Sequence, residues 1–187
     1  MLPLVQDGRA TICDVVVRRL KVNRDARGIL VEALRTDWPD VFQAGRRPFT
    51  QCYYSVTYPG IARDEDRWHA HQHQDDRFVV AQGDIVLALY DGRQDSPTKG
   101  QLNLLHLGTN AGDEQQHQVL VPPGVLHAYL VIGAHPAILL NFPTRLYDSS
   151  DEGRIPFAQS GVLLPDGRPF SWDALRREQE TILGRPT

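Results

Sequence analysis

The chain has 187 residues, which is enough for one domain with a hydrophobic core and too few for two ordinary domains. Hydrophobic residues make up 41% and charged residues 23%, a composition that is typical of soluble globular proteins and not of disordered chains or coiled coils. The formal net charge of -3 argues against the basic surface on which nucleic-acid-binding proteins depend.

Other functional classes are excluded by local features. No apolar run approaches the length of a membrane span, and the first residues lack the charged start and apolar core of a signal peptide. Cys13 and Cys52 are too few for a disulfide framework and too far apart for a CxxC metal motif. We therefore expect a soluble, cytoplasmic protein that binds neither nucleic acid nor membranes.

Short β-rich segments between glycines and prolines are the dominant pattern of the chain. The expected strands cover residues 11–20, 29–33, 50–58, 77–81, 84–90, 102–107, 118–121, 127–132 and 137–142. Many short strands with frequent turn signals indicate a sandwich, barrel or jelly roll. Near the C-terminus, Ser171 as N-cap and an apolar stripe of Leu175, Ile182 and Leu183 predict a short helix over residues 171–184. We expect an all-β fold in a single domain over residues 1–187, with a core at about 16–165 and this helix after it.

Three histidines alternate along a further segment, residues 68–77. His69, His71 and His73 are each two residues apart. Side chains two apart in a strand share one face, so all three can point into the same barrel interior.

Two motifs in this region resemble those of a known superfamily. His69, His71, Asp76 and Gly83 have the spacing His-x-His-x4-Asp-x6-Gly, which is similar to the first cupin motif with Asp in place of the usual Glu. Residues 122–127, ending in His127, match the second cupin motif, Pro-x-Gly-x2-His. The resemblance implies a double-stranded β-helix, the cupin jelly roll.

The same residues have two interpretations. His69, His71, Asp76 and His127 offer three imidazole nitrogens and one carboxylate oxygen, a ligand set that suits a divalent first-row metal ion. Alternatively, they are polar residues around the mouth of a pocket, with no ion bound.

Further segments resemble one cupin family in particular. Asp-x-Arg-Gly at residues 25–28 followed by Glu32, the strand at residues 49–63, and the turn Asp-x-Arg-x2-Ser-Pro-Thr-x-Gly at residues 91–100 are similar to the dTDP-4-dehydrorhamnose 3,5-epimerase family. The resemblance runs from about residue 16 to residue 165. It implies a cytoplasmic isomerase of deoxysugar or polysaccharide biosynthesis that acts on a nucleotide-linked 4-keto-6-deoxy sugar and requires no metal or other cofactor.

The resemblance also assigns catalytic positions. His69 matches the family's base, which takes a proton next to the 4-keto group. Counting seven residues back from Gly83 places Asp76 at the position of the lysine that stabilises the enolate. Arg77 does not replace that lysine, because neighbouring side chains of a strand point to opposite faces. Asn141 stands at the position of the family's tyrosine acid, and Ala158 replaces the aspartate partner of the base. The expected site has therefore departed from the family's pattern.

Binding residues match the family better. Arg27, Glu32, Gln51 and Arg63 match positions that grip the nucleotide and diphosphate, partly from a neighbouring subunit, and Asn141 is added as a substrate-binding candidate. The resemblance therefore implies a homodimer.

Three functions stay open on the sequence. The first is a sugar-nucleotide isomerase with an altered site, and the second is a metal-dependent cupin enzyme that acts on a small polar substrate through His69, His71, Asp76 and His127. The third is a sugar-binding or nucleotide-sugar-binding cupin without catalytic activity. Fold alone does not choose among them, because cupins host many chemistries.

Overall fold

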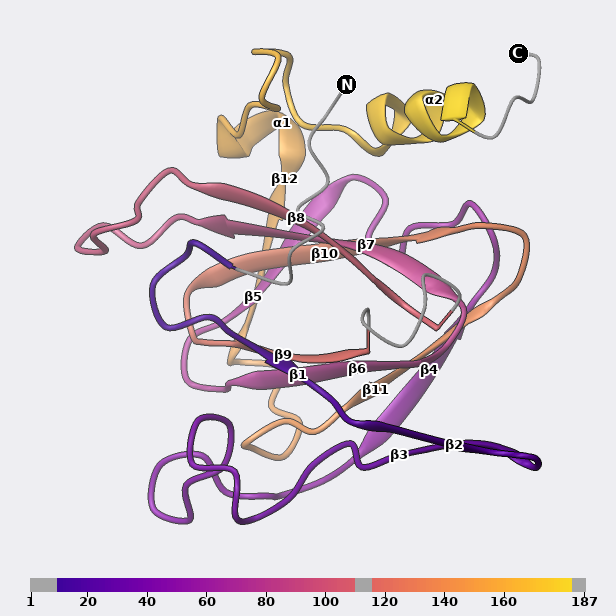
Figure 1. The fold of residues 1–187 in the computed structure, drawn as a ribbon. Helices are drawn as coiled ribbons and strands as arrows, with labels where there is room; N and C mark the ends of the chain where they lie inside the picture. Colours follow the sequence, from indigo (N-terminus) through magenta and orange to yellow (C-terminus); the bar gives the residue numbers. More distant parts are fainter. Residues whose placement is uncertain (1–9, 110–115, 183–187) are drawn as a thin grey trace.

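The computed structural model describes residues 10–109 and 116–182, whose strands form two antiparallel sheets that face each other (Figure 1). The first sheet contains, in spatial order, β1 (Val16–Arg19), β9 (His117–Val121), β6 (Asp76–Gln82), β11 (Ala137–Asn141) and β4 (Tyr53–Thr57). The second contains β12 (Glu152–Pro156), β5 (Arg67–His71), β10 (Val125–Ile132), β7 (Asp84–Asp91) and β8 (Leu102–Gly108). Most neighbouring strands are far apart in the sequence, as in a jelly roll.

Three smaller elements lie outside these sheets. The hairpin of β2 (Val22–Asp25) and β3 (Gly28–Val31) is a sheet of its own and projects sideways from the first sheet (Figure 1). Helices α1 (Phe157–Ser160) and α2 (Trp172–Ile182) lie over the outer face of the second sheet. Neither helix described is long and apolar enough to cross a membrane.

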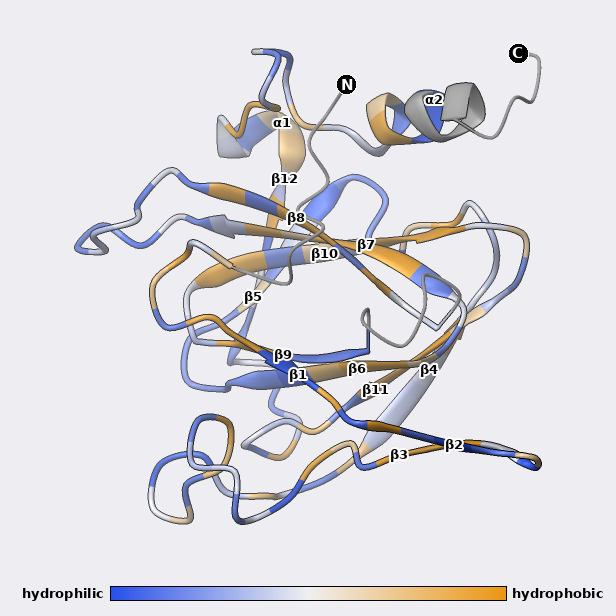
Figure 2. Cartoon of the chain, viewed as in Figure 1, coloured by the Kyte–Doolittle hydropathy of each residue, from blue (hydrophilic) through white to orange (hydrophobic). Residues whose placement is uncertain are grey.

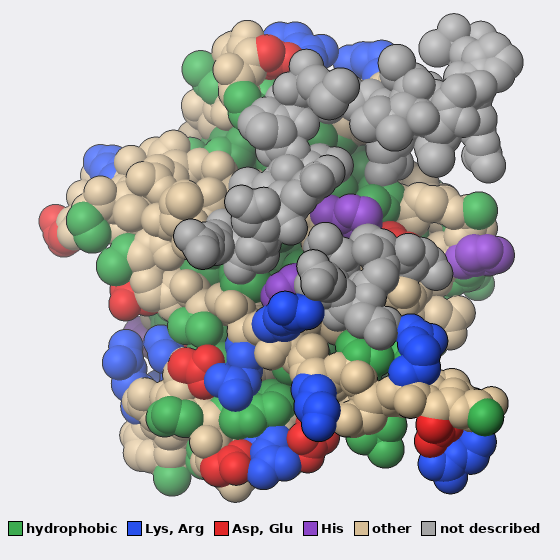
Figure 3. Space-filling view, viewed as in Figure 1, with side chains coloured by type: hydrophobic (Ala, Val, Ile, Leu, Met, Phe, Trp, Pro, Cys, Tyr) green, Lys and Arg blue, Asp and Glu red, His purple; other side chains and the backbone are tan. Residues whose placement is uncertain are grey.

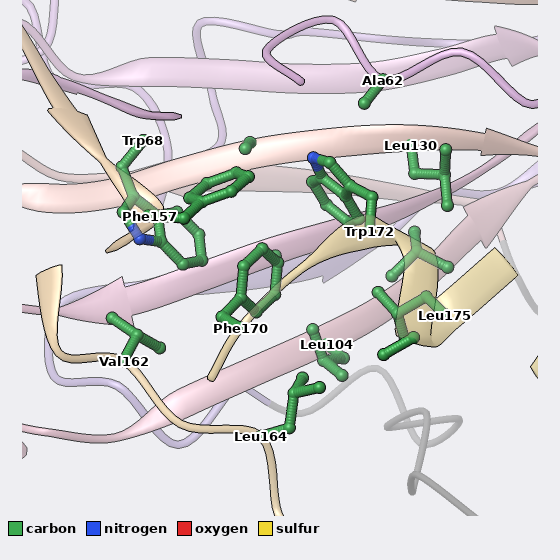
Figure 4. Close-up of a cluster of buried hydrophobic side chains, with 14 of the residues drawn as sticks. Ala62, Trp68, Leu104, Leu130, Phe157, Val162, Leu164, Phe170, Trp172 and Leu175 are labelled. Carbon is green, nitrogen blue, oxygen red and sulfur yellow. The ribbon is translucent and has the colours of Figure 1, made fainter. Parts of the chain in front are cut away.

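Alternation along the strands produces two apolar clusters. The odd-numbered residues of β10 point between the two sheets, and its even-numbered residues point to the outer face of the second sheet. The outer cluster is closed by Phe157, Phe170, Trp172 and Leu175, and the rings of Phe157 and Phe170 pack against Trp68 (Figure 4). Each large apolar side chain buried in this way contributes about 1.5–3 kcal/mol. In Figure 2, hydrophobic residues lie on β7, β10 and β11, and hydrophilic residues lie in many of the loops.

Two glycines of the cupin-like motifs are required by the turns that they occupy. Gly83 joins β6 to β7 with φ at 76°, and a Cβ atom there would lie 2.6 Å from the carbonyl oxygen of Pro136. Gly124 precedes β10 with φ at 78°, and its N–H donates to the carbonyl oxygen of His71 at 2.8 Å. Both turns need the left-handed region, which glycine adopts without strain. The second one also ties the end of β5 to the start of β10.

Charged side chains of both signs are interspersed on the lower part of the face shown in Figure 3. Ion pairs near the surface include the half-buried pair Arg18–Asp40 and the exposed pair Arg35–Asp37, both at 2.7 Å. Exposed pairs contribute only about 0–1 kcal/mol each.

The expected all-β jelly roll with a C-terminal helix is confirmed, and the differences are shifted element ends and a few additional elements. Only Val16–Arg19 of the expected strand 11–20 is extended, because the chain turns at Asp14, where φ is 67°. The expected C-terminal helix begins at Trp172, and its last two expected residues, 183 and 184, lie outside the described residues. The elements β2, β12 and α1 were not expected.

Candidate active site

A cavity of about 320 Å³ lies between the two sheets. Its size is at the lower end of the range of about 300–1,000 Å³ that is typical of small-molecule sites. Its polar lining includes Tyr53, His69, His71, Asp76, His127 and Asn141. The three motif histidines thus line one cavity, as the spacing of the motifs predicts.

The pairing of β5 with its two neighbours gathers side chains on the cavity face. His127 of β10 lies directly opposite His69, while Arg154 and Glu152 of β12 lie opposite His69 and His71. Directly opposed residues in an antiparallel pair share one face of the sheet. The alternate residues of β5 lie in the outer apolar cluster, which fixes the two histidines on the inner side.

His69 has the properties of a general base. Its Nε2 atom is screened from solvent and has no hydrogen-bond partner among the described residues, and Glu152 Oε1 lies 3.7 Å away. Burial, with a smaller effect from His71, lowers the pKa of His69 below its usual range, so the imidazole is neutral at neutral pH and can accept a proton. The nearby carboxylate then favours the imidazolium that forms.

His71, Asp76 and His127 form a compact buried cluster. Each offers one ligand atom, and the three atoms lie within 4.8 Å of one another. Asp76 Oδ2 is 3.4 Å from His71 Nε2 and 3.5 Å from His127 Nε2. His69 is not one of the three, although its ring centre lies 4.8 Å from that of His71. Of the four metal ligands predicted from the sequence, the structure gathers three in one cluster.

Hydrogen bonds direct the imidazole lone pairs into this cluster. His127 Nδ1 lies 3.2 Å from the carbonyl oxygen of Val125, and burial lowers the pKa of His127, so the single proton is on Nδ1 and Nε2 has a free lone pair. His71 Nε2 accepts a hydrogen bond from Gln74 Nε2 at 3.1 Å, which a bound ion would have to replace. Its own proton is then on Nδ1, which makes no hydrogen bond among the described residues and lies 3.4 Å from Asp151 Oδ2. Metal-binding histidines commonly have a carbonyl or carboxylate on their second nitrogen. The cluster therefore fits a divalent first-row ion.

Asn141 connects this cluster to the first sheet's edge strand. Its Nδ2 atom donates one hydrogen bond to Asp76 Oδ1 and another to the hydroxyl of Tyr53, both at 2.8 Å. Its Oδ1 atom accepts the backbone N–H of Arg77 at 3.0 Å, which fixes the orientation of the amide. Burial, followed by the charge of Asp76, raises the pKa of Tyr53 to about 12, so the phenol is protonated at neutral pH.

Two arginines bring positive charge to the cavity. Arg154 lies 3.7 Å from Asp64 and 3.5 Å from Glu152. Arg63 is exposed and has no ion pair within the described part of the chain, so its guanidinium is available to an anion. Guanidinium groups bind phosphate oxygens through paired N–H donors.

The other predicted substrate-binding residues lie outside this cavity. Arg27 is in the turn of the β2–β3 hairpin and pairs with Asp25 at 2.6 Å. Glu32 follows β3 and pairs with an arginine three residues further on. Gln51 donates to the carbonyl oxygen of Arg145 at 3.0 Å. These three residues do not line the cavity between the sheets, so their role stays a prediction that needs a second subunit.

Three further expectations can be compared with the geometry. His73 does not share the face of His69 and His71, because β5 ends at His71 and the next two backbone N–H groups donate to Asp151 Oδ1. Arg77 points away from the cavity, as predicted, and its guanidinium donates to backbone carbonyl groups such as that of Phe142. Ala158 lies on the exposed side of α1.

Two residues of the candidate site were missed by the sequence analysis: Tyr53, which lines the cavity, and Glu152, which lies next to His69. Glu152 supplies a carboxylate next to His69 although the expected aspartate position holds Ala158. The only sequence signal for it was a pair of acidic residues before a short segment with weak strand character. Tyr53 lies within an expected strand, but its partner Asn141 is 88 residues away.

Comparisons with known proteins agree with this architecture. The sequence model of a family described as dTDP-4-dehydrorhamnose 3,5-epimerase matches residues 9–164. A probable low-salt glycan biosynthesis epimerase, Agl13, from Haloferax volcanii is 42% identical over 149 residues, which are 78% of this chain and 88% of that protein. The spore coat polysaccharide biosynthesis protein SpsL of Bacillus subtilis is 34% identical over 161 residues, 85% of this chain and 95% of that protein.

A solved structure has the same fold. The dTDP sugar isomerase from Desulfovibrio desulfuricans G20 superposes with a TM-score of 0.71 at 26% identity, over 87% of this chain and 92% of that chain. The motif resemblance, the family match over most of the sequence and the relatives above 30% identity all agree. The chain belongs to the dTDP-4-dehydrorhamnose 3,5-epimerase family.

Proposed function

We propose that this protein is an epimerase that acts on a nucleotide-linked 4-keto-6-deoxy sugar in glycan or polysaccharide biosynthesis, with His69 as its base. One observation carries the proposal: the imidazole of His69 lines the cavity, and its Nε2 atom has no hydrogen-bond partner among the described residues and lies 3.7 Å from Oε1 of Glu152. The biosynthetic role follows from the names of the two relatives above 30% identity.

The chemistry needs His69, which lines the cavity, and Glu152 next to it. A 4-keto group makes the hydrogens on C3 and C5 acidic, because the carbanion is stabilised as an enolate. His69 Nε2 takes one of these protons, and Glu152 stabilises the resulting imidazolium. A cavity of about 320 Å³ accommodates a sugar ring, and the nucleotide would lie outside it.

Phosphate binding and assembly are part of the same proposal. Arg63, exposed at the cavity, binds the diphosphate. The β2–β3 hairpin presents Arg27 and, just after it, Glu32 to the cavity of a second copy, so that the protein works as a homodimer. Light scattering is expected to give the mass of a dimer at micromolar concentration, and a monomer would contradict this part of the proposal.

A second candidate function is favoured by the cluster of His71, Asp76 and His127. These residues would hold a divalent first-row ion, with the charge of Asp76 adding to its affinity. Such an ion supplies Lewis-acid stabilisation of a carbonyl or enolate oxygen, a task for which the family's lysine position here holds an aspartate. Elemental analysis of protein purified without an affinity tag tests whether the cluster holds an ion.

One experiment distinguishes the cofactor-free epimerase from the metal-assisted enzyme. The protein is incubated with dTDP-4-keto-6-deoxyglucose in D2O, with and without a chelator, and NMR follows deuterium at C3 and C5. Exchange that a chelator does not affect supports the cofactor-free epimerase, and exchange that stops and returns with added ion supports the metal-assisted enzyme. Binding of the sugar nucleotide without exchange in either condition would contradict both and leave a sugar-binding cupin.

A further inference from the structure

The wall of the cavity opposite His69 carries a second reactive side chain. His69 lies on β5 in the second sheet, whereas Tyr53 lies on β4 in the first sheet, and both line the same cavity. A sugar ring between the sheets therefore has the imidazole on one face and the phenol on the other. Inversion of a carbon requires this arrangement, since the proton must leave from one face and return to the other.

Because Asn141 donates to the Tyr53 hydroxyl, the hydroxyl proton of Tyr53 has no acceptor among the described residues. Asn141 Nδ2 donates to the Tyr53 hydroxyl at 2.8 Å, and its orientation is fixed by the backbone N–H of Arg77 on its oxygen. The Tyr53 oxygen therefore acts as acceptor, and no described residue accepts the Tyr53 proton. A phenol held in this way has a free proton, and the Asn141 amide can stabilise the phenolate that remains after transfer.

The other tyrosines at the cavity are less suited to this role. The hydroxyl of Tyr129 is shared between Ser55 at 2.9 Å and Thr57 at 3.0 Å and lies deep in the inner cluster. Tyr54 is 67% exposed, and as the neighbour of Tyr53 on β4 it starts from the opposite face of the strand. Tyr53 is 48% exposed, so its ring is partly buried at the cavity and within reach of a ligand.

We propose that Tyr53 is the catalytic acid that returns the proton to the face of the sugar opposite His69, with Asn141 as its positioning residue. The inference rests on the proposed epimerase function. The C–H bond at C3 or C5 breaks, its proton goes to His69 Nε2, and its electron pair enters the enolate. The Tyr53 O–H bond then breaks, its proton forms the new C–H bond on the other face, and the enolate returns to the ketone. Solvent reprotonates the phenolate and takes the proton from the imidazolium.

The test compares proton exchange with inversion in the same sample. The full-length protein, wild type or Tyr53→Phe, is incubated with dTDP-4-keto-6-deoxyglucose in D2O, and NMR measures both deuterium at C3 or C5 and the inverted product. In Tyr53→Phe, inversion is expected to fall by about 10²–10⁴-fold, the usual contribution of a positioned acid, while exchange with retention continues through His69. Tyr58→Phe is the matched control, because Tyr58 is 70% exposed and lies outside the cavity, and its two rates are expected to equal those of wild type.

A second variant distinguishes a catalytic effect from a loss of folded protein. Asn141→Ala is expected to lower the ratio of inversion to exchange, a ratio that a change in the amount of folded protein does not alter. Unchanged inversion in Tyr53→Phe, or inversion lost in Tyr129→Phe and kept in Tyr53→Phe, would overturn the assignment and leave the epimerase function intact. Absence of both exchange and inversion in wild type would instead refute the proposed function and the acid with it.

Discussion

Glu152→Gln tests how much the neighbouring carboxylate contributes to proton abstraction. The variant keeps the shape of the side chain and removes its charge, which lies 3.7 Å from His69 Nε2. At this distance, the attraction between imidazolium and carboxylate is about 1 kcal/mol in water and about 4 kcal/mol at the effective dielectric constant of a protein surface. The two side chains are 20% and 19% exposed, so an intermediate value of about 2 kcal/mol applies.

This energy predicts a loss of about 30-fold in the rate of deuterium exchange, since about 1.4 kcal/mol corresponds to a factor of ten. The substrate KM is expected to change little, because the imidazolium exists only after the proton has moved. Glu65→Gln is the matched control, as Glu65 pairs with Arg176 on α2 away from the cavity. An exchange rate within twofold of wild type in Glu152→Gln, or an equal loss in Glu65→Gln, would refute the reasoning.

Two further predictions concern substrate binding and stability. Arg63→Gln is expected to raise KM for the sugar nucleotide by about tenfold, with kcat within twofold of wild type, because a charge-assisted contact to phosphate is lost; an unchanged KM in steady-state kinetics would show that the diphosphate binds elsewhere. Asp91→Asn is expected to cost about 2–3 kcal/mol of unfolding free energy in urea at pH 7, because its fully buried carboxylate accepts hydrogen bonds from Arg93, Ser96 and Thr98. Burial alone would raise the pKa of Asp91, but these hydrogen bonds outweigh it and hold the pKa well below its usual range. The contribution is therefore full above about pH 4 and is lost as the pH falls towards the folded-state pKa, so the difference between wild type and variant should narrow below pH 4, and a constant difference would be contrary to this account.

Much of the fold could be predicted because its strands alternate and end at special turns. The expected strands at residues 84–90 and 102–107 nearly coincide with β7 and β8, whose residues are apolar and bounded by turn residues. Strand β12 was missed because its sequence, Glu-Gly-Arg-Ile-Pro, has little apolar alternation. It becomes a strand through its pairing with β5, a contact between segments more than 80 residues apart.

Part of the candidate site could also be predicted from the sequence, and part of it could not. The sequence motifs predicted His69, His71 and His127 in one cavity because two-residue spacing and a short motif are local signals. Glu152 and Tyr53 could not be found in this manner. Each reaches the candidate site through a strand pairing that is distant in sequence, β12 with β5 for Glu152 and β4 with β11 for Tyr53.

Identification of the base is the most direct test of the central claim. Deuterium exchange at C3 and C5 of dTDP-4-keto-6-deoxyglucose is measured for wild type, His69→Asn and His135→Asn, the last being a control in the exposed turn between β10 and β11. We predict exchange in wild type and in His135→Asn, and none in His69→Asn at full protein concentration and unchanged thermal stability. Exchange that continues in His69→Asn would contradict the account, because proton abstraction would then come from a group other than the neutral imidazole beside Glu152.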